Sequence, residues 1–272
     1  MSIFDFLNYA FIQRAYLAGI FIAILCAMLG LFLVLRKLSL IGDGLSHISF
    51  GAIALGLFFG WYPFYIAIPV VLIGSYVIIK LTEKAKIYGD AAIGIISSVG
   101  IAGGVILASL SRGFNVDLFS YLFGNILAIS NQEVYLSIGL SVIVLLIILL
   151  LYNDLFSATF DEEYAQITGV STKRVNNVLI FLTAITVVLA IKVVGIMLVS
   201  ALLILPAVTA LQTAKGFKGA MIISSLVAIL SVLTGITASF FLDIPAGATI
   251  IMVNFILFLL SLIWQPLARK FS

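Results

Sequence analysis

The sequence has very little charge. Only 9% of its 272 residues are Asp, Glu, Lys or Arg, whereas 64% are hydrophobic. A soluble domain carries about 25% charged residues because its surface must be hydrated. A chain with so few charges cannot cover a water-facing surface of this size, which excludes a soluble globular protein. We therefore expect an all-α, polytopic integral membrane protein whose spans are runs of about 20 apolar residues.

The sequence also lacks the residues that build disulfides and resident metal centres. It has one cysteine, Cys26, and one histidine, His47. A single cysteine cannot form an intrachain disulfide, and a single histidine cannot supply the H-E-x-x-H cluster of a zinc metalloprotease. These absences exclude an intramembrane metalloprotease, and no permanently bound cofactor is predicted.

A phosphate-binding loop is missing as well. No G-x-x-x-x-G-K-[ST] segment occurs anywhere in the chain. If transport by this chain is driven by ATP, a separate polypeptide must therefore hydrolyse the nucleotide. We predict a pore-forming subunit rather than an enzyme.

Nine apolar segments are candidates for transmembrane helices. Each is too long and too uniformly apolar for a strand of a membrane barrel, whose residues would alternate. The segment 195–213 and the stretch 116–130 could instead be re-entrant, so we expect eight or nine transmembrane helices in a single domain, 1–272. The candidate spans are 12–36, 41–60, 63–81, 91–110, 132–152, 175–192, 195–213, 219–242 and 246–266.

Basic residues predict the orientation of the chain because they stay on the cytoplasmic side of a membrane. They gather in alternate loops, and threading nine spans with the N-terminus outside places every cluster in the cytoplasm. We therefore expect a multi-pass cell-membrane protein with a cytoplasmic C-terminus, in contact with the lipid bilayer and with no nucleic-acid partner. The clusters are Arg36 and Lys37; Lys80, Lys84 and Lys86; Lys173 and Arg174; Lys215 and Lys218; and Arg269 and Lys270.

The longest predicted cytoplasmic connection, about 153–174, contains both acidic and apolar residues. Its sequence "FDEEYA" predicts a short helix with acids in the first turn, as the helix dipole favours, and Gly169 is placed to end it. One interpretation is a solvated linker. Its length and apolar side chains favour a surface that docks a cytoplasmic partner, formed by Phe160, Asp161, Glu162, Glu163, Tyr164, Ala165 and Gly169.

Polar groups inside a membrane are costly and mark candidate functional sites. Asp43 and His47 are four residues apart, which places both side chains on one face of the second span. A carboxylate and a neutral imidazole at this spacing can share a divalent transition metal such as zinc or manganese. The alternative is an intrahelical hydrogen bond that only hides two polar groups. Ser46 and Ser49 are candidates for supporting a metal pathway, as is Pro206, which is expected to kink or break its helix.

Two donors are too few for a closed metal site. Structural zinc sites use four ligands, whereas a conduction site must bind weakly enough to release its ion. With one histidine per chain, we expect transient coordination of the ion, completed by a second copy of the chain.

Five motifs, in order along the chain, resemble those of the membrane permeases of ABC importers for zinc, manganese and iron. "LVLRKLSLIGDGLSHISFGAIALG" resembles the R-x-x-S-L-x-x-D-x-x-S-H-x-x-x-x-G element of that family, although Gly44 stands where the family usually has alanine. The other four are "GDAAIGIISSVGIAGGVIL", "DLFSYLFGNILAIS", "FDEEYAQITGV" and "KVVGIMLVSALLILPAVTALQTAK".

The resemblance implies a type II-like ABC importer permease fold in which two permease chains pair around a central pathway. It further implies two cytoplasmic ABC ATPase subunits below and a metal-binding protein docked outside. Asp43 and His47 match the residues implicated in metal passage, and residues 158–170 match the coupling segment. "SLIGDGLSHIS" and "LFGNILAIS" look closer to zinc-type members, so Zn²⁺ is the expected substrate and Mn²⁺ the next.

A self-sufficient secondary metal transporter or channel is the alternative function. It would use the Asp–His pair as a proton or metal relay and would require further carboxylates within the membrane. The predicted spans contain few, which favours the ATP-driven importer.

Overall fold

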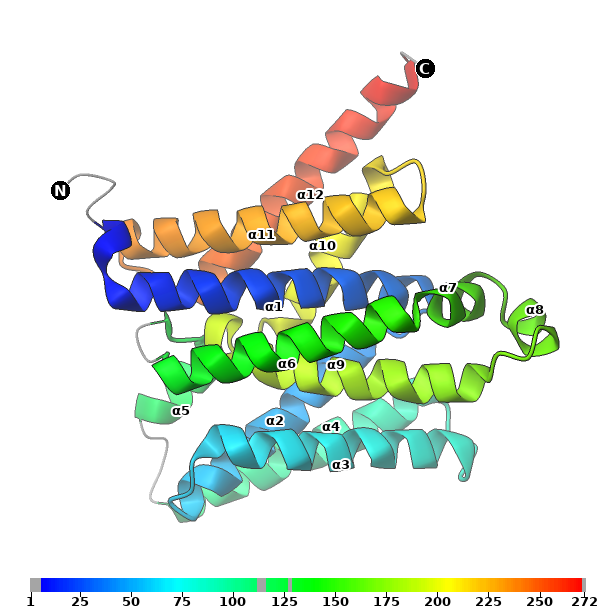
Figure 1. The fold of residues 1–272 in the computed structure, drawn as a ribbon. Coiled ribbons are helices and arrows are strands. Elements are labelled where there is room, and N and C mark those ends of the chain that lie inside the picture. The colour runs from blue at the N-terminus through cyan, green and yellow to red at the C-terminus, as the bar shows by residue number, and fades with distance from the viewer. Residues whose placement is uncertain (1–5, 112–115, 127–128, 271–272) are drawn as a thin grey trace.

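The chain folds into an all-helical bundle in the computed structural model, which describes residues 6–111, 116–126 and 129–270 (Figure 1). Among these, side chains are described for all but residues 7, 116–119 and 264–270. The elements in chain order are η1 (Phe6–Asn8), α1 (Ala10–Leu35), α2 (Leu40–Phe58), α3 (Pro63–Glu83), α4 (Gly89–Leu110), α5 (Val116–Phe123), α6 (Asn131–Leu150), α7 (Tyr152–Phe160), α8 (Glu162–Ile167), α9 (Thr172–Val194), α10 (Val199–Thr213), α11 (Phe217–Leu242) and α12 (Ala246–Lys270).

Eight helices in the described part of the chain are long and apolar enough to cross a membrane. They confirm the prediction of a polytopic membrane protein with eight or nine spans. The ninth candidate, 195–213, is shorter than predicted because α9 ends at Val194 and the helix resumes only at Val199, which leaves α10 with 15 residues. Helix α10 leads toward the end of the bundle where α11 begins (Figure 1).

The helices run between two ends of the molecule (Figure 1). One end, here called the α8 end, carries α7 and α8, the α3–α4 and α10–α11 turns, and the C-terminus. The opposite end carries the N-terminus, α5 and the α11–α12 connection. The basic clusters at residues 36–37, 80–86, 173–174, 215–218 and 269–270 all belong to segments at the α8 end.

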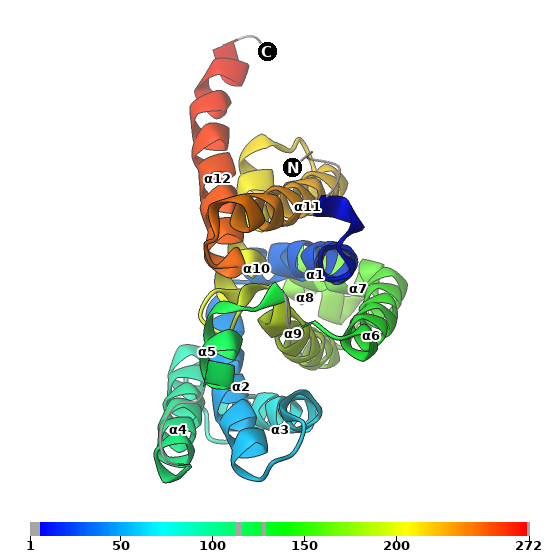
Figure 2. The same cartoon turned by 90° about the vertical axis from the view of Figure 1, so that its left-hand side faces the viewer.

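Helix α1 lies at the centre of the bundle, with α11 on one side and α6 on the other, and it also packs on α9 and α10 (Figures 1 and 2). Its buried residues include alanine, glycine and cysteine, which allow neighbouring helices to approach closely. Helix α2 packs with α3 and α4 in a second group. Helices α4 and α12 are mostly exposed and apolar, as expected of surfaces that face lipid or another apolar partner.

Candidate functional site

Asp43 and His47 lie on the first half of α2. The structure places their side chains together, with His47 Nδ1 3.8 Å from Asp43 Oδ2. Asp43 belongs to the first turn of the helix, where the dipole favours a carboxylate. The i, i+4 spacing therefore produces a shared face with one oxygen donor group and one imidazole.

The imidazole of His47 hydrogen-bonds to α4 rather than to Asp43. Its Nδ1 lies 2.7 Å from Ser97 Oγ, whereas 3.8 Å to the carboxylate is too long for a hydrogen bond. Helix α4 comes this close because a glycine lies at the contact: a Cβ on Gly100 would be only 2.9 Å from the His47 carbonyl oxygen. The intrahelical hydrogen bond considered from the sequence is thus not formed between these two side chains.

The Asp43–His47 pair is accessible from outside the chain. The two side chains are 49% and 27% exposed, respectively. When Nδ1–H donates to Ser97, the lone pair of Nε2 is free to bind an ion. Among the described residues, no group of three or more His, Cys, Asp and Glu side chains could hold a metal. Asp43 and His47 by themselves are therefore too few ligands to close a metal coordination shell.

The three residues predicted to support the pathway occupy different places. Ser46 and Ser49 are fully buried, and their hydroxyls donate to the carbonyl oxygens of Asp43 (2.7 Å) and Leu45 (2.8 Å), so neither reaches the carboxylate or the imidazole. Pro206 is buried within α10. The structure brings α10 against α2 one residue before Asp43, where a Cβ on Gly42 would lie 2.7 Å from Leu203 Cδ1.

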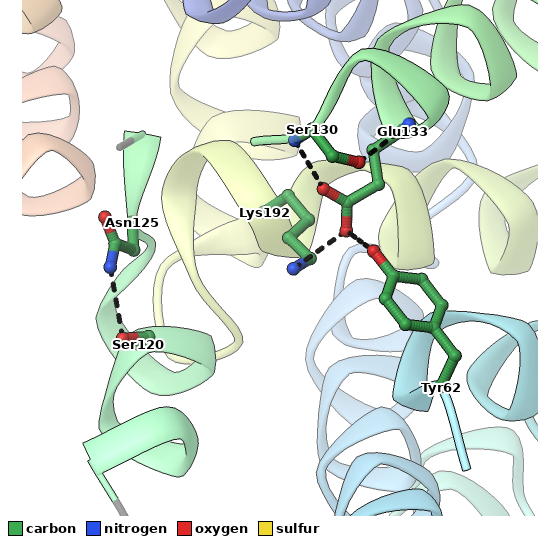
Figure 3. A network of polar contacts seen from close by, with 6 residues as sticks. All are labelled: Tyr62, Ser120, Asn125, Ser130, Glu133 and Lys192. Atoms are coloured by element: carbon green, nitrogen blue, oxygen red, sulfur yellow. Dashed lines mark hydrogen bonds and ion pairs between the residues drawn. The ribbon is translucent and has the colours of Figure 1, made fainter. Parts of the chain in front are cut away.

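A second polar cluster, which the sequence did not predict as a unit, joins the start of α6 to the end of α9 (Figure 3). Both lie at the end of the bundle opposite α8 (Figure 1). Lys192 Nζ is 2.9 Å from Glu133 Oε1, and only 14% and 4% of these side chains are exposed. Tyr62 donates a hydrogen bond to the same carboxylate oxygen. The backbone N–H of Ser130 donates to Glu133 Oε2 at 2.8 Å, as part of a capping box that begins α6.

This cluster joins helices that are far apart in the sequence. Glu133 begins α6, Lys192 lies near the end of α9, and Tyr62 precedes α3. Lys192 Nζ also lies 4.4 Å from the ring centroid of Tyr121 on α5, a cation–π distance. Burial, with the hydrogen bond to Glu133, raises the pKa of the Tyr62 hydroxyl above its ordinary value, so Tyr62 stays protonated and acts as a donor. The sequence did contain one indication of this cluster: the charges of Glu133 and Lys192 both fall at the ends of otherwise apolar spans.

The backbone between α9 and α10 is irregular and packs against the last turn of α5. Gly195 has φ +90°, a conformation that favours glycine, and it ends α9. Beyond it, Ile196 N–H donates to Tyr121 O at 3.0 Å and Met197 N–H to Leu122 O at 3.2 Å. Asn125, whose amide donates to Ser120 Oγ at 3.2 Å, follows on the facing segment (Figure 3). Residues 127 and 128 of the "DLFSYLFGNILAIS" motif lie outside the described residues.

The predicted coupling segment forms α7 and α8, which project beyond the bundle at the α8 end (Figure 1). Asp161 caps α8 by accepting a hydrogen bond from the Tyr164 N–H at 2.9 Å, and Gly169 follows the helix with φ +88°. The short helix with acids in its first turn, Glu162 and Glu163, is therefore present. Phe160 ends α7 instead of starting this helix. Phe160 and Tyr164 are about three-fifths exposed, whereas Ala165 is fully buried and anchors α8.

Arg36 connects α1 to this segment. It caps α1 and lines a small cavity of about 250 Å³ together with Thr159, Glu162 and Asn176. Burial lowers the pKa of the Arg36 guanidinium, and the carboxylate of Glu162 partly offsets this. Leu38, two residues before the start of α2, lines the same cavity, so the predicted coupling segment lies beside the α1–α2 connection.

Comparisons with known proteins agree with the motifs. The model of the ABC 3 transport family matches residues 8–265. A manganese transport system membrane protein, MntC, from Halalkalibacterium halodurans is 33% identical over 96% of this chain and 89% of its own length. A high-affinity zinc uptake system membrane protein, ZnuB, from Haemophilus influenzae is 34% identical over 91% of this chain and 95% of its own.

A solved structure supports the same fold. PsaBC from Streptococcus pneumoniae in complex with Fab superimposes with a TM-score of 0.86 at 32% identity, covering 95% of this chain and 94% of that one. The family match over residues 8–265 includes the segments that carry Asp43, His47 and α8.

Proposed function

Because the chain belongs to the ABC 3 transport family, we propose that it is the permease subunit of an ATP-driven importer that brings Zn²⁺ or Mn²⁺ into the cell. The observation that best supports this proposal is that the side chains of Asp43 and His47 are adjacent and exposed on α2. They offer a carboxylate and an imidazole to a passing ion. Zn²⁺ is the first candidate from the sequence motifs, and Mn²⁺ the second because several relatives are named for manganese.

The ion binds between two copies of the chain in this proposal. In the described part of the chain each copy contributes Asp43 and His47 as strong donors, and both are accessible from outside the chain. Two such half-sites facing one another would supply four ligands, two carboxylates and two imidazoles. Weak binding by each half allows the ion to leave when the two chains move apart.

ATP hydrolysis by two separate ATPase subunits drives the cycle, and α7 with α8 is the surface on which they act. The exposed aromatic side chains of Phe160 and Tyr164 support this role, because aromatic residues are the usual hot spots of protein interfaces. The basic clusters at the α8 end support a cytoplasmic position for it. The opposite end, with α5 and the Glu133–Lys192 pair, then faces a metal-binding protein outside the membrane.

Metal uptake by isosteric variants tests the proposal. Cells that depend on this chain for uptake of radiolabelled Zn²⁺ or Mn²⁺ would carry Asp43→Asn or His47→Gln. We expect uptake to fall at least about ten-fold while the ATPase still copurifies with each variant. Ser46→Ala is the matched control, because its hydroxyl is buried and bonded to the backbone. Normal uptake of both metals by the two variants would overturn the assignment.

A further inference from the structure

An open groove of about 720 Å³ runs between α6 and α11 at the α8 end of the bundle. Its floor is Met28 of α1, which is almost buried at 8% exposure. Its walls are apolar, from Leu149 on α6 and from Ile222 and Leu226 on α11, and its mouth is polar, with Asn153 and Lys218.

The groove exists because α6 and α11 both pack against α1 from opposite sides (Figures 1 and 2). In the described part of the chain the two outer helices have little packing against each other. The two outer helices that line the groove, α6 and α11, lie on the side of the bundle away from α2 and α4 (Figure 2). If two chains pair through the face with Asp43 and His47, as the proposed function has it, this groove faces lipid.

The mouth of the groove is positively charged. Lys218 is exposed and has no ion pair among the described residues. It lies in the first turn of α11, whose N-cap is Gly216 and has no side chain to satisfy the first backbone N–H groups. Among the described side chains that line the groove, none is acidic. The mouth therefore matches a ligand that carries negative charge.

The dimensions of the groove match one leaflet of a membrane. From Lys218 to Leu226 the axis of α11 rises about 12 Å, and half of a hydrocarbon core is about 15 Å. Tyr152 lies at the mouth in a stack with Phe156, at a centroid distance of 6.0 Å, an arrangement typical of the membrane–water boundary. A polar mouth at this boundary and an apolar channel below it fit a headgroup and an acyl chain.

We infer that this groove binds an anionic phospholipid, with its phosphate at Lys218 and one acyl chain along Met28, Leu149 and Ile222. The lipid would join the α6–α7 corner to the start of α11 next to the coupling segment. Basic residues beside transmembrane helices contribute about 1 kcal/mol each to binding of anionic lipid, or about a five-fold change in affinity.

Native mass spectrometry of the full chain, released from nanodiscs with equal amounts of phosphatidylglycerol and phosphatidylcholine, tests the inference. We expect the wild-type chain to retain one phosphatidylglycerol in preference to phosphatidylcholine. Lys218→Gln should lower this preference about five-fold, whereas Lys215→Gln, which lies outside the groove, should change it less than about two-fold.

A second pair of variants tests the apolar walls of the groove as the binding site of the acyl chain. Ile222 and Ile263 are equally exposed at 63%, but only Ile222 lines the groove. Ile222→Trp should abolish retention of the lipid, and Ile263→Trp should leave it unchanged. The inference would be overturned if Lys218→Gln and Lys215→Gln, or Ile222→Trp and Ile263→Trp, changed retention of phosphatidylglycerol equally. It would also be overturned if the wild-type chain showed no preference for phosphatidylglycerol. Disulfide cross-linking of two chains through Ile222→Cys would overturn it as well, since a protein partner would then fill the groove.

Discussion

Lys192 near the end of α9 and Glu133 at the start of α6 form an ion pair, 2.9 Å from Nζ to Oε1, that is almost completely buried. The carboxylate also accepts hydrogen bonds from Tyr62 and from the backbone of Ser130 (Figure 3). Two charges in the apolar part of a protein are tolerated only when their partners are in place. The ion pair and the hydrogen bonds to Glu133 therefore hold the start of α3, the start of α6 and the end of α9 together at the end opposite α8.

Removal of one partner should destabilise the chain strongly. Lys192→Met keeps the length of the side chain but leaves the Glu133 carboxylate buried without its counter-charge. We expect a loss of about 3–5 kcal/mol in the free energy of unfolding, measured by denaturant titration in mixed micelles. The double variant with Glu133→Gln should recover part of the loss, because a neutral amide is less costly to bury.

The Lys173–Glu83 pair provides the matched control. Its atoms are 3.1 Å apart, but its side chains are 68% and 23% exposed. Lys173→Met should therefore cost no more than about 1 kcal/mol. Equal losses for the two lysine variants would show that burial of the Lys192–Glu133 pair has no consequence for stability.

Close packing between α2 and α4 should make Gly100 intolerant of any side chain. A Cβ there would lie 2.9 Å from the backbone of both His47 and Ile48, so α4 would have to move away. We expect Gly100→Ala to cost about 1–3 kcal/mol in thermal unfolding experiments and to impair metal uptake. Gly103→Ala on the same helix meets open space and should be neutral or slightly stabilising. A stable, fully active Gly100→Ala chain would contradict the described contact.

Ser97 should act as a positioning residue for His47, since its hydroxyl is 2.7 Å from Nδ1. Loss of such a hydrogen bond to a metal-binding histidine typically lowers metal affinity about 10–100-fold. Ser97→Ala should raise the apparent KM for metal uptake by about ten-fold and leave the maximal rate nearly unchanged, and Ser97→Thr should restore the KM. Ser98→Ala, at the exposed neighbouring position, should have no effect. A Ser97→Ala chain that loses only maximal rate would contradict the positioning role.

The sequence predicted those parts of the fold that depend on local signals. Low charge and long apolar runs established a bundle of membrane helices, and the acids after Phe160 with Gly169 predicted a short helix that the structure contains as α8. Capping and the helix dipole act within one turn, so a short segment suffices to predict them. The i, i+4 spacing of Asp43 and His47 likewise predicted their shared face.

Contacts between distant segments could not be predicted in this way. The run 195–213 is mostly apolar, yet its first residues leave the helix because Ile196 pairs with the backbone of Tyr121, 75 positions earlier in the chain. His47 finds its hydrogen-bond partner in Ser97, fifty positions later. Lys192 and Glu133 each look like an ordinary residue at a helix end until the fold brings them together.

The exposed side chains of α7 and α8 should carry the affinity for the ATPase. Phe160 and Tyr164 are 57% and 60% exposed on helices outside the bundle, and aromatic residues are the usual hot spots of interfaces. Tyr164→Ala should weaken binding of the cognate ATPase to the chain in nanodiscs at least about thirty-fold, as expected for a hot-spot loss of about 2 kcal/mol. Tyr135→Ala is the control, because Tyr135 is 76% exposed but lies at the opposite end, on α6. Unchanged ATPase affinity in a Phe160→Ala/Tyr164→Ala double variant would mean that the ATPase binds elsewhere on the chain.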